Sequence, residues 1–87
     1  MQEVTGKKYL TIQAQANTDY AVKYSDEQYV DLLNNTGSAL KISNDEIDSD
    51  NYAVVPAGGA YNDIRIDGGT LYITVGDSAG EISLIAR

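Results

Sequence analysis

The sequence predicts one small all-β domain, an antiparallel β-sandwich or a small barrel of about seven to eight strands. Apolar residues alternate with polar ones in several short segments, which is the pattern of half-buried strands. Turn-forming residues interrupt these segments about every ten residues. The chain has 87 residues, so it has room for a single domain.

The first two strands are expected between residues 8 and 24. Residues 1–7 are polar, and we expect a flexible N-terminal segment or arm that precedes a domain over residues 8–87. Alternation over residues 8–16 predicts the first strand, and a turn at residues 17–19 separates it from a second strand at residues 20–24. These segments predict the start of the core.

Residues 25–35 allow two interpretations. Ser25 and Gln28 match a capping box that would open a helix. The alternation continues through this segment, however, and residues 34–37 form a turn signal directly after it. We therefore favour a hairpin that joins a strand at residues 28–34 to a strand at residues 38–44, with the helix as the alternative.

The remaining strands follow an acidic loop at residues 44–51. They are expected at residues 52–55, 64–66, 71–75 and 82–84. Pro56 ends the first of them, because proline lacks a main-chain donor. Residues 67–69 (Asp-Gly-Gly) predict a tight hairpin turn with positive φ, and residues 76–80 predict the last turn.

The residue types that are missing exclude whole classes of chemistry. The chain contains no cysteine and no histidine. A disulfide, a thiolate nucleophile and a zinc-thiolate site are therefore impossible, as are a Ser-His-Asp triad and an imidazole base. We expect a protein that is not an enzyme, with no catalytic residue, no cofactor and no bound metal.

The charge bears on the partners. The chain has 13 acidic and 6 basic residues, a net charge of −7. Nucleic-acid binding depends on clustered lysine and arginine, so we expect no nucleic-acid partner. The apolar runs are much shorter than the roughly 20 residues of a membrane span, and no signal peptide precedes them, so we expect no membrane partner.

The acidic loop at residues 44–51 is the one candidate for metal binding. Asp45, Glu46, Asp48 and Asp50 are hard oxygen ligands of the kind that calcium prefers. Their spacing does not match an EF-hand loop, which needs a central glycine and a terminal glutamate. A solvated surface loop is the favoured interpretation, and calcium-dependent melting would indicate the other.

Four apolar side chains are expected to point away from the core. If Leu71, Ile73, Ile82 and Leu84 face inward, Tyr72 and Ile85 face outward. Tyr9 and Leu33 have the same outward phase in their own strands. Exposed apolar groups are typical of a subunit contact or a docking surface. We therefore predict that Tyr9, Leu33, Tyr72 and Ile85 contact a partner.

The second half of the chain carries a resemblance to a known class of protein. Residues 34–37 read N-N-T-G, residues 56–59 read P-A-G-G, residues 69–72 read G-T-L-Y and residues 80–82 read G-E-I. This order of turns and strands resembles small β-rich virion proteins of tailed bacteriophages, over residues 30–87.

The resemblance implies a particle component without catalytic residues. Such a protein would be made in the host cytoplasm and carried on the capsid surface of the virion, where it would decorate and stabilise the head by docking on the major capsid protein or another virion protein. A homo-oligomer is possible. A neck, tail or fibre accessory protein, or a receptor- or carbohydrate-binding module, is the alternative function.

Overall fold

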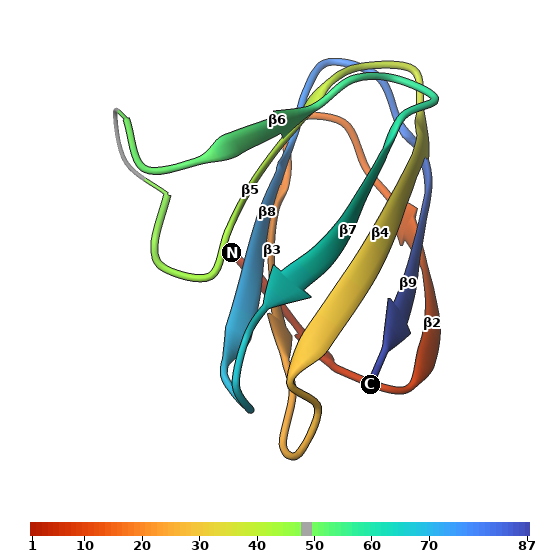
Figure 1. Cartoon of the computed structure of the whole chain (residues 1–87). Helices are drawn as coiled ribbons and strands as arrows, with labels where there is room; N and C mark the ends of the chain where they lie inside the picture. The colour runs from red at the N-terminus through yellow and green to blue at the C-terminus, as the bar shows by residue number, and fades with distance from the viewer. Residues whose placement is uncertain (48–49) are drawn as a thin grey trace.

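The computed structural model describes residues 1–47 and 50–87, which form a sandwich of two β-sheets (Figure 1). Among these residues there is no helix. The strands are β1 (Gln2–Thr5), β2 (Tyr9–Ala14), β3 (Asp19–Lys23), β4 (Tyr29–Thr36), β5 (Leu40–Ser43), β6 (Ala53–Val55), β7 (Ala60–Arg65), β8 (Thr70–Val75) and β9 (Gly80–Ala86). The predicted all-β class is confirmed.

The two sheets remain separate, which makes the domain a sandwich and not a barrel. The five-stranded sheet has the order β1-β3-β8-β5-β6, and the four-stranded sheet has the order β2-β9-β4-β7. Neighbouring strands are antiparallel except β1 and β3, which are parallel. Every connection crosses from one sheet to the other except that between β5 and β6, which are neighbours in the same sheet.

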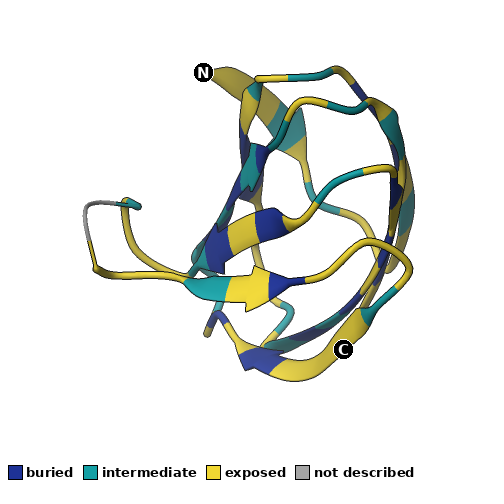
Figure 2. Ribbon diagram, turned by 90° about the horizontal axis from the view of Figure 1, so that it is seen from above, coloured by how far each residue is buried: buried dark blue, intermediate teal, exposed yellow. Residues whose placement is uncertain are grey.

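The core lies between the sheets and is built from alternate residues of each strand (Figure 2). Leu32 and Leu84 of one sheet belong to the same buried cluster as Leu71 and Ile73 of the other, and all four are almost fully buried. The alternation read from the sequence therefore marks the inward-facing residues of β2, β4, β8 and β9 correctly. Their burial supplies most of the driving force for folding.

Residues 29–36 form strand β4, so the helix alternative is wrong. The expected hairpin is also wrong, because β4 belongs to the four-stranded sheet and β5 to the five-stranded sheet. The turn signal at residues 34–37 misplaced the end of the strand: Asn34 and Thr36 continue the inward-facing series and are buried. These polar side chains satisfy each other and nearby carbonyls, which allows the strand to continue.

Asn34 joins three parts of the chain at this end of the sandwich. Its Nδ2 donates to the carbonyl oxygens of Ser38 at 2.9 Å, Val55 at 3.0 Å and Pro56 at 3.1 Å. Its Oδ1 accepts the main-chain N–H of Thr36 at 2.9 Å and lies 2.7 Å from the Thr36 hydroxyl. One buried amide thus ties β4 to the turn before β5 and to the crossing from β6 to β7.

The sequence predicts a flexible segment over residues 1–7, whereas in the structure residues 2–5 form strand β1. This strand raises the total among the described residues to nine, above the seven to eight predicted. Its sequence, QEVT, has one apolar residue, so alternation gives no signal. Main-chain pairing with β3 holds it instead, assisted by an ion pair between Glu3 and Lys23 at 3.0 Å.

The end of β1 packs directly on the core. Gly6 lies against the ring of Tyr24, so close that a Cβ on Gly6 would be 2.4 Å from the Cδ1 of that ring. The Tyr24 hydroxyl is buried and has no hydrogen-bond partner among the described residues. Burial, with a smaller effect of Glu27, raises the pKa of Tyr24 to about 12.

Strand β7 begins four residues before the segment 64–66 that the sequence predicts, and it contains a β-bulge. Its pairing with β4 shifts between Val30 and Leu32, where β7 carries one extra residue. Asp63 has a positive φ of 57° at this point. The extra residue breaks the alternation on which the sequence prediction depended. The turn at residues 67–69 has the expected positive φ at Asp67 and Gly68, although it joins different sheets.

Candidate docking surface

Three of the four predicted contact residues lie together on the outer face of the four-stranded sheet. Tyr9, Leu33 and Ile85 have 73%, 40% and 49% of their surface exposed. Tyr9 is directly opposite Ile85 in the pairing of β2 with β9. Ile85 lies two positions from the residue opposite Leu33, so these side chains are diagonal neighbours on β9 and β4.

Ala60 of β7 extends this group, and the sequence analysis did not find it. It is exposed and lies directly opposite Leu33. We call Tyr9, Ile85, Leu33 and Ala60 the apolar strip, since they follow one another across β2, β9, β4 and β7. The alternation could have indicated Ala60 only if the bulge in β7 had been known.

A charged cluster borders the apolar strip beside Ile85. Arg87 Nη1 lies 2.8 Å from Asp31 Oδ2, and Arg87 Nη2 pairs with Asp63 Oδ1. The other carboxylate oxygen of Asp31 accepts the main-chain N–H of Asp63 at 2.8 Å. This N–H, and then the Arg87 guanidinium, lower the pKa of Asp31. The cluster fixes the bulge of β7 next to the strip.

The fourth predicted residue, Tyr72, does not belong to this surface. It lies on β8 in the five-stranded sheet, opposite Ala21 and Ser43, so it faces away on the other side of the sandwich. It is half-buried and lines a small cavity of about 170 Å³ with Met1, Glu46 and Ile47. The prediction that Tyr72 shares a surface with Tyr9, Leu33 and Ile85 is wrong. Alternation along a strand shows that a side chain points outward, but it does not show to which sheet the strand belongs.

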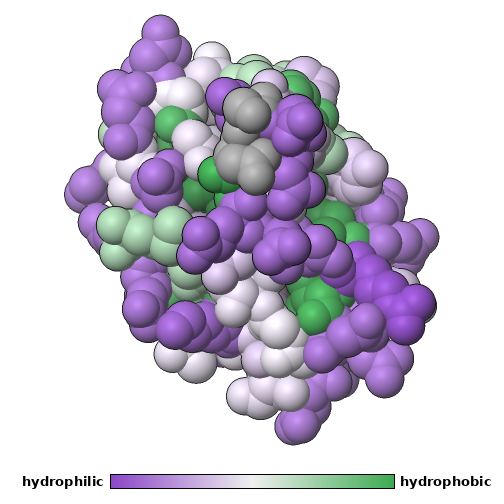
Figure 3. Space-filling view, turned by 90° about the vertical axis from the view of Figure 1, so that its left-hand side faces the viewer, coloured by the Kyte–Doolittle hydropathy of each residue, from purple (hydrophilic) through white to green (hydrophobic). Residues whose placement is uncertain are grey.

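The described residues of the acidic loop, 44–47 and 50–51, lie at the ends of β5 and β6 in the five-stranded sheet. In Figure 3, hydrophilic side chains cover most of the face that carries this loop, and hydrophobic side chains form small separate groups. Within residues 1–47 and 50–87, no group of three or more acidic side chains is placed to hold a metal ion. Asp48, one of the four candidate calcium ligands, lies outside the described residues.

Most of the basic side chains are engaged within the protein. Lys23 pairs with Glu3, Arg65 with Asp67 at 2.8 Å, and Arg87 with two carboxylates. The ammonium of Lys41 lies 4.7 Å from the centre of the Tyr52 ring. The electrostatic potential around the protein is therefore negative, and within the part of the chain that the structure describes no cluster of basic side chains is available to neutralise phosphates.

Comparison with protein-family models, with curated proteins and with solved structures found no match. The described residues include no helix that is long and apolar enough to cross a membrane. The apolar strip and its charged border are therefore the features from which a function is inferred.

Proposed function

We propose that the protein is a non-enzymatic structural component of a bacteriophage virion that docks on the capsid through the apolar strip. The observation that carries this proposal is the position of Tyr9, Ile85, Leu33 and Ala60 side by side on one sheet face. Exposed apolar groups of this kind are typical of protein interfaces, in which tyrosine is enriched. The resemblance of residues 30–87 to small β-rich virion proteins is what suggests the virion context.

The partner is a protein surface with an apolar centre and a neutral or basic border. The net charge of −7 would repel packaged DNA and a second copy of the same acidic chain. It also keeps the protein soluble at the high local concentration on a particle surface. The major capsid protein is the partner we propose, and docking across neighbouring capsomers would stabilise the assembled shell by mass action.

Charge reversal on the strip tests this proposal. Leu33→Asp combined with Ile85→Asp is expected to abolish co-sedimentation with capsids that lack the protein. Both side chains are exposed, so circular dichroism and the urea midpoint should change little. The matched control is Val54→Asp, which alters an exposed apolar residue of the five-stranded sheet. Unchanged binding of the double variant, or equal loss in the control, would contradict the proposed face.

The number of copies per particle distinguishes a protein that decorates the head from one at another position in the particle. Quantitative mass spectrometry of purified particles should give a number on the scale of the capsomers if the protein decorates the head. A much smaller number would place it at the neck, tail or fibre. Absence from the particles would refute the virion role.

A further inference from the structure

A second site lies at the side of the sandwich where the edge strands β6 and β7 face each other. A cleft of about 410 Å³ opens there between the acidic loop and β7. This volume is within the range of about 300–1,000 Å³ that is typical of small-ligand sites. The cleft is on β6, β7 and the loop, and the apolar strip is on the outer face of the four-stranded sheet, so the inference is independent of the proposed function.

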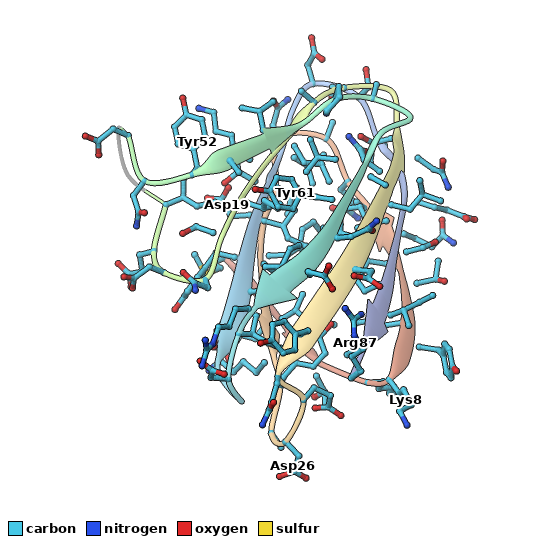
Figure 4. All side chains as sticks on the ribbon, viewed as in Figure 1. Lys8, Asp19, Asp26, Tyr52, Tyr61 and Arg87 are labelled. Carbon is cyan, nitrogen blue, oxygen red and sulfur yellow. The ribbon has the colours of Figure 1, made fainter. Side chains whose placement is uncertain are left out.

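The floor of the cleft is apolar. Ile42, Ile64 and Ala53 line it, and the ring of Tyr61 lies beside them with 44% of the residue exposed. Tyr61 is paired with the buried Leu32, which places its side chain on the inner side of β7. Figure 4 shows Tyr61 reaching from β7 towards β6, whereas Tyr52 stands on the other side of β6, against Lys41. Tyr52 also contributes to the lining of the cleft, but its ring is covered by Lys41, so Tyr61 is the ring on which we expect a ligand to stack.

Main-chain groups supply much of the polarity of the walls. Each of β6 and β7 pairs on one side only, so each presents N–H and C=O groups along its other edge. Asn44 spans one end of the cleft, where its Nδ2 donates to the carbonyl oxygen of Arg65 at 2.9 Å. Asp50 and Asn51 complete the rim. Donors and acceptors thus surround an apolar floor.

These features favour a neutral ligand over a charged one. Of the charged residues along β7, Asp63 is paired with Arg87 and Arg65 is paired with Asp67. Asp50 on the rim also has an interaction within the protein. The charged groups that line the cleft are thus engaged within the protein. A ligand that brought a net charge would gain little from them and would lose its hydration.

The same edges are poorly suited to adding a peptide strand. Strand β6 has three residues and is followed by Pro56, which cannot donate to a ladder. Strand β7 is interrupted by the bulge at Asp63. A regular strand therefore has no continuous edge to pair with, whereas a short ligand can use the separate donors and acceptors.

We infer that this cleft binds a neutral saccharide, with the C–H face of one sugar ring stacked on Tyr61 and its hydroxyls bonded to Asn44 and to the edges of β6 and β7. A sugar combines an apolar face with closely spaced hydroxyls, and the cleft combines an aromatic and aliphatic floor with closely spaced donors and acceptors.

Chemical-shift titration of the ¹⁵N-labelled protein tests the inference. The probes are methyl β-glucoside, methyl β-galactoside and N-acetylglucosamine. At least one of them should shift the amides of Asn44, Ala53 and Tyr61 in a saturable manner. Tyr61→Ala should weaken binding by about tenfold or more, while Tyr61→Phe should stay within about threefold because the ring remains.

Two controls make the result decisive. Tyr9→Ala removes an exposed tyrosine of the apolar strip and should leave the saccharide affinity unchanged. Circular dichroism and the Tyr61→Phe variant separate loss of stacking from loss of folding. Absence of saturable shifts with all three probes would overturn the inference, as would equal binding by Tyr61→Ala. Stronger binding of a lysine amide, or of a peptide of alternating valine and threonine, would also overturn it.

Discussion

Replacement of Asn34 by alanine is expected to remove a large part of the stability of the domain. Asn34 is completely buried and its side chain contacts three carbonyl oxygens and two groups of Thr36. Alanine would leave the buried Thr36 N–H without an acceptor and would remove one donor from each of the carbonyls of Ser38, Val55 and Pro56, although Pro56 keeps the N–H of Gly59.

The size of the effect follows from one unpaired donor and three lost hydrogen bonds. A buried donor that loses its partner costs about 1–3 kcal/mol, and each lost hydrogen bond contributes about 0.5–1.5 kcal/mol. With water reaching some of these groups, we expect Asn34→Ala to reduce the free energy of unfolding by about 3–5 kcal/mol. A domain of this length has a total stability of roughly 4–13 kcal/mol, so the variant would be marginal.

Urea unfolding measured by circular dichroism and tyrosine fluorescence gives the required comparison. The denaturation midpoint should fall while the slope with denaturant stays the same. Asn35→Ala is the matched control, because the neighbouring side chain points to solvent and should matter by less than about 0.5 kcal/mol. A loss below about 1 kcal/mol for Asn34→Ala would refute the argument that this amide joins β4 to the β6–β7 crossing.

Three further predictions concern Tyr24, Gly6 and Asp31. Tyr24→Phe removes a buried hydroxyl without a partner among the described residues, so the stability in urea should be unchanged or higher by up to about 1 kcal/mol, and the tyrosine ionisation near pH 12 should disappear from the absorbance titration. Gly6→Ala should reduce the free energy of unfolding by about 1–3 kcal/mol in the same assay, because the new Cβ would collide with the Cγ, Cδ1 and Cε1 atoms of the Tyr24 ring. Folding lowers the pKa of Asp31, so its ionised carboxylate stabilises the protein at pH values above the unfolded pKa of 3.8, and this stabilisation is lost as the pH falls through the lower pKa of the folded state. Asp31→Asn should therefore reduce the decrease in melting temperature at acidic pH. An unchanged decrease would contradict this assignment.

The core was the most predictable part of the fold. Residues 71–75 alternate between buried and half-buried side chains, as the sequence indicated, and residues 82–84 follow the same rule. The reason is that alternate side chains point to opposite faces of a strand, so a period of two is recorded in the sequence. The same periodicity correctly placed Tyr9, Leu33 and Ile85 on the outside.

Strand β1 and the bulge of β7 could not be predicted in this way. The pairing of β1 depends on main-chain hydrogen bonds, which leave no pattern in side chains such as those of Gln2 and Glu3. The bulge at Asp63 shifts the phase within β7 and hides the exposed Ala60 and the inward-facing Tyr61. The cleft that Tyr61 lines exists only because two edge strands from different sheets face each other.

The sequence by itself determined that the chain is an all-β domain, which apolar side chains of β2, β4, β8 and β9 face its core and which chemistries the missing cysteine and histidine exclude. Only the tertiary structure decided which strands are neighbours. Alternation assigns each residue to the inside or the outside of its own strand, but it contains no information about the partner strand. Seven of the eight connections cross between the sheets. For that reason Tyr72 lies on one side of the sandwich, and Tyr9, Leu33 and Ile85 form a surface on the other.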